Sequence, residues 1–347
     1  MEFLLGTETQ DGYCRMELAA AAHKLVSDVT PVKPGQNVLI TADGASDARV
    51  VNAVAGATMA AGGVPVVLWY PIMPAPMQEA PAPVTGAAAA ADVWFDFASM
   101  YLLYSPSYQA AIAHKCIYVA LPAMDVDMMV RTVGQTCPAL LDEMRRTLYR
   151  ISQEAYEVRV QTRAGTDLVM RVDGAGDPFW EDPQPGEGFA QMLLGQSGFM
   201  AFRDSYAGTL VIDGTIWPPS EVGLLREPVR LEIRDGLIQD VAGGPQALVF
   251  SRWLSSFSHR EAQRMDHACY GFNPGVRRLT GRIVEDERLF GCVQFGIGAS
   301  EWGSPVHTDG VVTAPTVSLD GVAIEEDGVY VHPELVRLCR EMGLPGY

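Results

Sequence analysis

Apolar and polar positions follow two different patterns in the two halves of the chain. In the first 150 residues, short apolar runs alternate with segments of helical spacing. Residues 47–61 are rich in Ala and Val at that spacing and stop at Gly62-Gly63, which predicts a helix with a glycine C-cap. The apolar runs predict buried strands at 37–41, 64–70, 92–96 and 116–120. Strands separated by helices are typical of a parallel sheet with helices on its faces, so this half predicts a doubly wound α/β domain.

The second half alternates apolar and polar residues with period two. Segments 158–162 and 167–172 flank Ala164-Gly165, which predicts a hairpin. Further alternating runs lie at 208–213, 229–238 and 316–320, and residues 250–265 predict a helix. We therefore expect a mainly antiparallel α+β domain over 154–347, after an α/β domain over 1–153. The predicted helix 138–154 joins the two.

The length of the chain indicates the number of domains, and its charge disfavours two classes of binding partner. A chain of 347 residues suits two domains, each able to bury a core. With 25 Lys and Arg against 42 Asp and Glu, the formal charge is −17, which repels phosphate backbones and anionic lipid. We expect neither a nucleic-acid partner nor a membrane partner. Residues 43–46, after the first predicted strand, lack the glycine motif of dinucleotide sites.

The N-terminal sequence and the spacing of the cysteines predict a cytoplasmic protein. The N-terminus lacks the basic start and apolar segment of a signal peptide, and no apolar run is long enough to span a bilayer. The six cysteines are scattered and form no CxxC pair, which is typical of reduced thiols.

The chain has only six histidines, and two of them stand beside acidic residues in a suggestive arrangement. In His307-Thr308-Asp309 the imidazole and the carboxylate are two residues apart, so in a strand both face the same side. His267, after the predicted helix, offers a third ligand. Two histidines and one carboxylate leave three positions open on an octahedral iron, enough for a chelating substrate and O₂.

The same residues also fit simpler interpretations. His307 and Asp309 can hydrogen-bond each other in a loop, and His267 can be a partly buried histidine with a hydrogen-bond partner. The other four histidines, His23, His114, His259 and His332, are expected on the surface.

Residues 266–275, 286–298 and 307–309 resemble the C-terminal half of the aminopeptidase T and S group of metallopeptidases. The resemblance implies an aminopeptidase T/S-like fold and a site with two metals. That group carries a Glu where this chain has His267 and a His where it has Gln294, and it shares the glutamate that is Glu287 here. Since a neutral Gln is a poor metal ligand, these departures disfavour a dinuclear peptidase site.

A histidine at position 267 is instead what the 2,5-dihydroxypyridine 5,6-dioxygenase family carries. His267, Gly271 and Pro274 match its His followed by Gly-x-x-Pro, and the final His-x-Asp matches His307 and Asp309. The resemblance extends over nearly the whole chain. It implies one Fe(II) held by His267, His307 and Asp309, a small aromatic substrate with O₂, and assembly as a homo-oligomer of two or more copies.

The resemblance also suggests roles for other residues. Where the dioxygenases carry an acid/base histidine this chain has Tyr104, which we predict as the catalytic residue. Gln294 and Tyr270 are predicted to line the substrate site, although Tyr270 also fits a place in the core. Glu187 lies where the aminopeptidases have a Gly-Glu ligand, and it fits either substrate binding or a plain loop carboxylate. A small hydroxyl residue of the dioxygenase pocket is replaced by Gly296, so the identity of the ring stays open.

The predicted reaction is extradiol-type opening of a hydroxylated N-heterocyclic ring, such as a dihydroxypyridine, by an O₂-incorporating oxidoreductase. A second interpretation is a metallo-hydrolase that uses Glu187, Glu287 and the His307/Asp309 pair with two zinc or cobalt ions. A third is a metal-free binding protein on the same fold.

Overall fold

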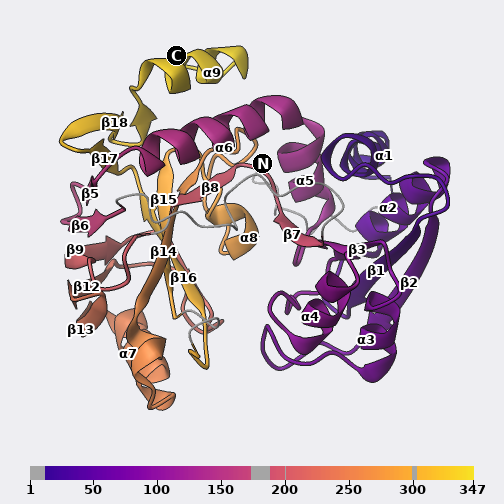
Figure 1. Cartoon of the computed structure of the whole chain (residues 1–347), viewed down its shortest axis with the longest axis horizontal. Helices are drawn as coiled ribbons and strands as arrows, with labels where there is room; N and C mark the ends of the chain where they lie inside the picture. Colours follow the sequence, from indigo (N-terminus) through magenta and orange to yellow (C-terminus); the bar gives the residue numbers. More distant parts are fainter. Residues whose placement is uncertain (1–11, 173–187, 200, 299–302) are drawn as a thin grey trace. The chain divides into compact units, whose positions relative to one another are not determined.

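The computed structural model describes residues 12–172, 188–199, 201–298 and 303–347, and it divides the chain into two compact units (Figure 1). The first unit comprises Met1–Pro138 and Pro183–Leu194, and the second comprises Ala139–Asp182 and Gly195–Tyr347. The pattern of the sequence predicts a boundary at 153/154. In the structure the helix α6 (Pro138–Gln153) falls almost wholly in the second unit, and a later segment returns to the first.

The first unit is built on a parallel sheet, as predicted. Its strands run in the order β2-β1-β3-β4-β7, and all neighbours are parallel. The strands are β1 (Asn37–Asp43), β2 (Val64–Tyr70), β3 (Val93–Asp96), β4 (Ile117–Ala120) and β7 (Phe189–Met192). The first four match the predicted runs. Since all four residues of β3 and six of the seven in β1 are buried, their continuous apolar character reflects a sheet covered on both faces.

Helices cover both faces of this sheet, which confirms the doubly wound prediction. In Figure 1, α1 and α2 lie together on one face, and α3 and α4 lie on the other. The predicted helix 47–61 is α2, and the Asp47 side chain caps its N-terminus by accepting a hydrogen bond from the Arg49 amide. The helical segments of this unit are α1 (Arg15–Lys24), η1 (Leu25–Val29), α2 (Ala48–Ala60), α3 (Ala82–Ala88), α4 (Pro106–Ala113), α5 (Val126–Met129) and η2 (Val130–Gly134).

A buried carboxylate organises the carboxyl end of β3. Asp96 is fully buried and accepts hydrogen bonds from the Thr41 hydroxyl at 2.8 Å and the Tyr118 hydroxyl at 2.6 Å. It also accepts from the backbone amides of Ala98 and Leu102. Through the last of these bonds, Asp96 holds the turn that leads to Tyr104. Burial raises the pKa of Asp96 to about 6, although these donors oppose the shift.

This carboxyl group predicts a pH-dependent stability. Because its pKa is higher in the folded chain than in the unfolded chain, its contribution is complete below the unfolded value of 3.8 and is lost as the pH rises through about 6. Relative to Asp96→Asn, the wild type is expected to gain about 1–3 kcal/mol of unfolding free energy between about pH 7.5 and about pH 4.5. Denaturant titrations of both proteins at the two pH values measure this difference. A difference that is constant with pH, or of opposite sign, contradicts it.

The second unit contains two antiparallel sheets. The eight-stranded sheet contains the alternating runs predicted from the sequence, including the hairpin of β5 and β6. Its order is β13-β12-β9-β6-β5-β17-β18-β19. The strands are β5 (Glu157–Gln161), β6 (Asp167–Arg171), β9 (Ala207–Ile212), β12 (Val229–Arg234), β13 (Leu237–Gly243), β17 (Thr316–Leu319), β18 (Val322–Glu326) and β19 (Val329–Tyr330).

The six-stranded sheet was largely unforeseen. Its order is β11-β10-β16-β15-β14-β8. All six residues of β15 and five of the six in β16 are buried, so these strands show no alternation of apolar and polar residues. The strands are β8 (Gln196–Phe199), β10 (Thr215–Trp217), β11 (Gly223–Leu224), β14 (Met265–Gly271), β15 (Cys292–Ile297) and β16 (Thr308–Thr313). The helical segments of this unit are α6, α7 (Pro245–Ser256), η3 (Arg260–Gln263), α8 (Ile283–Asp286) and α9 (Pro333–Glu341).

The predicted helix 250–265 is wrong in its second half. The helix α7 ends at Ser256, and Ser258 adopts a left-handed φ of 48°, which an α-helix does not tolerate. His259 then caps the short helix η3 by accepting from the Glu261 amide, and Met265 begins β14. As a result, His267 lies within a strand rather than after a helix.

The cysteines and the helices of the structure can be compared with what the sequence predicts. All six cysteines lie among the described residues and all are free thiols, as the scattered pattern predicted. Within the described part of the chain, no helix is both long enough and apolar enough to cross a bilayer.

Candidate metal centre

A β-bulge brings two neighbouring residues to one point of the six-stranded sheet. In the pairing of β14 with β15, Met265 stands opposite Ile297 and Ala268 stands opposite Phe295. Asp266 and His267 therefore share the single position opposite Gly296. Such a bulge lets consecutive side chains reach the same region instead of opposite faces of the sheet. The next strand adds Asp309, which pairs with Gly296 and faces the same side.

The structure brings together the three predicted metal ligands. The Asp309 Oδ1 atom lies 3.6 Å from His267 Nε2 and 3.2 Å from His307 Nε2. The two imidazole rings stack with centroids 5.3 Å apart. Their side chains are between 10% and 20% exposed, so the group is largely removed from water but remains reachable.

A second carboxylate, Asp266, lies on the other side of the imidazoles. Its Oδ2 atom is 3.0 Å from His267 Nδ1 and 3.7 Å from His307 Nδ1. Asp266, His267 and His307 each offer an atom within 4.8 Å of the others, so they form an alternative ligand set. The two sets differ in which imidazole nitrogens they use.

Hydrogen bonding selects between the two sets. His307 Nδ1 lies 2.8 Å from the Gly298 carbonyl oxygen, so it carries the proton and donates it there. His267 Nδ1 donates in the same way to Asp266. Both Nε2 atoms then lie on the side of Asp309, where a bound cation can take the place of a proton. Asp309 is thus the carboxylate that can share a cation with both histidines, and Asp266 is placed to orient His267, as carboxylates behind metal-bound histidines commonly do.

The charged groups around His267 and His307 raise the pKa of both imidazoles. Burial lowers the pKa of His307, but Asp309 and Asp266 outweigh burial and raise it to about 9. Burial likewise opposes protonation of His267, yet its neighbours, Cys269 and Asp266 foremost, hold its pKa well above the usual value. Two carboxylates facing two imidazoles form a site whose negative charge a bound cation can neutralise in place of protons.

Gly296 makes room for His267. A Cβ atom at position 296 would lie 2.4 Å from His267 Cε1 and 2.6 Å from Nδ1, far inside contact distance. The sequence comparison treated this glycine as the loss of a pocket hydroxyl. In the structure its space is filled by the imidazole of His267, so any side chain at 296 must displace that ring.

Gln294, predicted to line the substrate site, does belong to the group. Its side-chain amide lies 3.1 Å from His267 Nε2 and donates to Asp309 Oδ1. The Gln196 amide lies behind it, 3.5 Å from Gln294 Oε1, and donates to Glu287 at 2.8 Å. A line of amides therefore connects Asp309 to Glu287, which is also paired with Arg288 at 3.0 Å.

Tyr270 does not join the group, which corrects its predicted place at the substrate site. It stands opposite Ser197 in β8, its hydroxyl lies 3.0 Å from Ser152 of α6, and its ring packs 5.3 Å from Phe199. Since neighbouring strand residues face opposite sides, Tyr270 points away from the face that carries Cys269 and Gln294. It is fully buried and belongs to the core under α6.

The remaining predicted residues lie elsewhere. Tyr104 belongs to the first unit, where it adopts a left-handed φ of 65° and packs edge-on against Tyr108. Glu187 lies outside the described residues. Of the four histidines expected on the surface, His23, His114 and His259 are exposed and His332 is half-buried.

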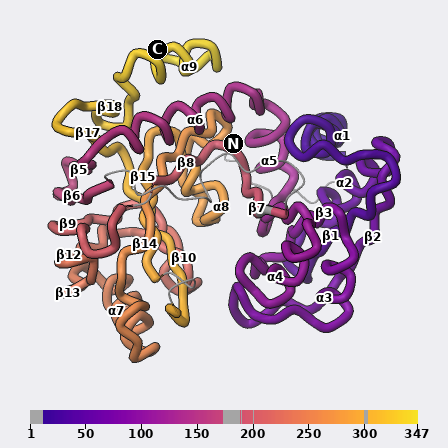
Figure 2. Tube along the Cα trace, in the orientation of Figure 1, coloured from indigo at the N-terminus to yellow at the C-terminus, as the bar shows by residue number. Residues whose placement is uncertain are grey.

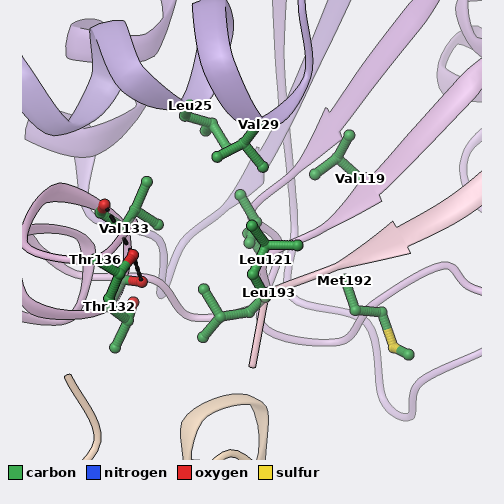
Figure 3. Close-up of a pocket in the computed structure, with 10 residues that line it drawn as sticks. Leu25, Val29, Val119, Leu121, Thr132, Val133, Thr136, Met192 and Leu193 are labelled. Carbon is green, nitrogen blue, oxygen red and sulfur yellow. Dashed lines mark hydrogen bonds between the residues drawn. The ribbon is translucent and has the colours of Figure 1, made fainter. Parts of the chain in front are cut away.

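The first unit also contains a small cleft with a mainly apolar lining. Figure 3 shows Val119 and Leu121 at the end of β4, facing Leu25 and Val29. Thr132 and Thr136 are the polar residues of its lining, and the Thr136 hydroxyl is bound to the Thr132 carbonyl. Since none of its lining residues is charged or offers a strong metal ligand, this cleft is a poor candidate for a metal centre.

Sequence reasoning missed the role of Asp266. Its only signal was its position beside His267, and in a regular strand that position would turn it to the opposite face. If Asp266 orients His267, Asp266→Ala is expected to weaken metal binding roughly 10- to 100-fold. Asp266→Asn, which keeps an acceptor for the imidazole proton, should weaken it less. Competition with a chelating metal indicator measures both. Equal losses in the two variants, or none in either, contradict the role.

The arrangement can be compared with known proteins. Residues 19–332 match the family described as 2,5-dihydroxypyridine 5,6-dioxygenase, NicX. This match covers well over half of the chain. The chain belongs to this family. Family membership agrees with the resemblance seen in the sequence.

Individual relatives agree with this assignment. The 2,5-dihydroxypyridine 5,6-dioxygenase of Pseudomonas putida is 26% identical over 276 residues, which cover 72% of this chain and 73% of the relative. The solved structure of that organism's dioxygenase superposes with a TM-score of 0.75 at 19% identity, covering 92% of this chain and 99% of the other. AmpT from Thermus thermophilus gives a TM-score of 0.67 at 14% identity, covering 92% and 100%. The last two likenesses confirm the fold predicted from the sequence.

Proposed function

We propose that this protein is a non-haem iron(II) dioxygenase that opens the ring of a hydroxylated N-heterocyclic aromatic compound such as a dihydroxypyridine. The observation that carries the proposal is the convergence of His267 Nε2 and His307 Nε2 on Asp309 Oδ1, in a chain of the NicX family. Two histidines and one carboxylate with open positions are typical of oxygenase sites for ferrous iron.

The donor set fits one metal better than two. Gln294 occupies the position at which the two-metal aminopeptidases carry a histidine, and it donates its amide hydrogen to Asp309. Glu287 is engaged by Gln196 and Arg288. When bound, ferrous iron would relay electrons from the ring to O₂, and its charge would acidify a ring hydroxyl.

The residues of the chain have separate tasks in this proposal. Asp266 and the Gly298 carbonyl hold the two imidazoles in the tautomer that presents Nε2. Gln294 is placed to hydrogen-bond a bound ring as well as Asp309. The low exposure of His307 and Asp309 limits access of water to the reacting ring.

Two predicted residues extend the proposal. Tyr104 is proposed to donate or accept a proton during ring opening; with an ordinary pKa near 10, a tyrosine is protonated at neutral pH and is better suited to donation. Glu187 is proposed to contact the substrate.

We also propose that the protein works in the cytoplasm as a homo-oligomer, with O₂ and a small aromatic compound as its reaction partners.

The deciding experiment is metal analysis of anaerobically purified protein, combined with O₂ uptake on a panel of hydroxypyridines. We expect about one iron per chain and stoichiometric O₂ consumption with at least one dihydroxypyridine. Two zinc or cobalt ions per chain, with hydrolysis of aminoacyl amides and no O₂ uptake, would overturn the proposal in favour of a hydrolase.

A further inference from the structure

The outer edge of the parallel sheet in the first unit is a long strand with an apolar surface. Among the described residues, β2 has β1 as its one sheet neighbour (Figure 2). Val64, Val66 and Trp69 are 49%, 47% and 49% exposed. Edge strands are normally protected by charged side chains, by proline, by bulges or by short length, and of these devices β2 has only Pro65. β2 has seven residues, pairs with β1 without a register shift and carries no charge.

The surroundings of β2 are uncharged as well. No Asp, Glu, Lys or Arg occurs between Arg49 and Glu79, although 19% of the chain is charged. This uncharged segment, residues 50–78, includes nearly all of α2, the whole of β2 and the loop that follows. It also exposes Met59 and Ile72, at 67% and 51%. Two copies with a net charge of −17 repel each other over most of their surfaces, and that repulsion is weakest here.

The backbone of β2 defines how a partner can pair with it. The Val64 amide donates to the Gln36 carbonyl at 2.8 Å, so the backbone groups of every second residue from Val64 point toward β1. Those of residues 65, 67 and 69 point outward. Pro65 has no N–H, which is tolerated at an edge position. The outward donors are therefore the amides of Val67 and Trp69.

We propose that β2 pairs antiparallel with β2 of a second copy of this chain, across a two-fold axis at Val67, so that the two parallel sheets become continuous. In this register Val67 faces its own counterpart, and each amide of that pair donates to the opposite carbonyl. At either end the Trp69 amide donates to the Pro65 carbonyl of the other copy, and the Trp69 ring packs on that proline. Because Val67 is the centre of β2, all seven residues of both strands are paired.

The strand is complementary to itself, which favours a second copy over an unrelated peptide. Two edge strands that hydrogen-bond across a two-fold axis must be antiparallel. In that arrangement Pro65, which has no N–H, lies opposite Trp69 of the other copy. The proposal names the surface behind the homo-oligomer proposed above. It uses no residue of the metal centre, so its failure would leave the proposed reaction untouched.

The first test is the mass of the intact protein by light scattering. The wild type is expected at twice the 37.6 kDa of one chain, or at a larger even multiple. Val67→Pro removes the donor at the axis but no bond to β1. Trp69→Lys removes the ring that packs on Pro65 of the other copy and places a charged side chain on the edge strand. Both are expected to halve the mass while keeping the wild-type circular dichroism spectrum. Leu248→Lys, at a 53% exposed residue of α7, is the matched control and should leave the mass unchanged.

The second test is disulfide trapping in a Cys137→Ser background, which removes the exposed native thiol. Val67→Cys is expected to form a covalent dimer on mild oxidation, because directly paired Cα atoms lie about 5.5 Å apart. Val64→Cys is the control on the same strand. Its counterpart lies six residues along, roughly 20 Å away, and should not cross-link.

Three outcomes would overturn the proposal. They are a wild-type mass of a single chain, a Val67→Pro protein with the wild-type mass, and cross-linking of Val64→Cys as fast as that of Val67→Cys. If Val67→Pro does not fold, the Trp69→Lys mass and the cysteine pair still decide the matter.

Discussion

His267→Ala is expected to abolish both stable iron binding and O₂ uptake while leaving the fold intact. The change removes one of three protein ligands, and it also leaves Asp309 without one of its two imidazole neighbours. The loss of activity should exceed the roughly 100-fold effect of removing a partner that only orients a ligand. Iron content after anaerobic reconstitution and initial rates of O₂ uptake measure the two effects, and His307→Ala and Asp309→Ala should behave alike.

His259→Ala is the matched control for this experiment. His259 is an exposed histidine that caps η3, and it lies in the same unit as the metal centre. Its replacement should keep the iron content and turnover of the wild type. Near wild-type turnover in any of the three ligand variants would remove the basis of the proposed function. Equal losses in His259→Ala would instead show a general effect of losing a histidine.

Adding a side chain at Gly296 is expected to damage the metal centre without unfolding the protein. A Cβ atom there overlaps three atoms of the His267 ring, at 2.4 to 2.8 Å, and no other contact is closer. The ring can turn away, so the cost to folding should be small. Turning moves Nε2 away from Asp309 and Nδ1 away from Asp266, so we expect metal affinity to fall roughly 10- to 100-fold for Gly296→Ala. Indicator competition measures the affinity, and thermal denaturation measures the stability.

Gly296→Ser separates the two interpretations of this position. If the glycine marks only the loss of a pocket hydroxyl, the serine should keep metal binding and change the preferred ring. If His267 needs the space, serine and alanine should be equally harmful. Gly86→Ala, on α3 where a Cβ atom meets nothing within 4 Å, is the control and should leave metal binding unchanged. Wild-type metal affinity in both Gly296 variants would contradict the steric role.

The sequence by itself determined the class of each half and the identities of the three ligand candidates. The parallel sheet could be predicted because β1 and β3 are buried on both faces and therefore form continuous apolar runs. The eight-stranded sheet could be predicted because strands such as β5 and β12 alternate buried and exposed residues. His307 and Asp309 were readable as a pair because their two-residue spacing matches the strand period. The local context of His267 left a partly buried histidine as a simpler interpretation, and the family resemblance favoured the ligand.

Only the tertiary structure decided how the centre is assembled. β15 and β16 are too uniformly buried to show a period, so the sheet that carries the centre was hidden in the sequence. The bulge that sets Asp266 and His267 together opposite Gly296 depends on pairing with a strand far along the chain. Pairing also turned Tyr270 into the core and Gln294 toward the ligands. The order of residues specifies which chemical groups are present, whereas strand register, a property of two segments at once, decides which of them face the candidate metal centre.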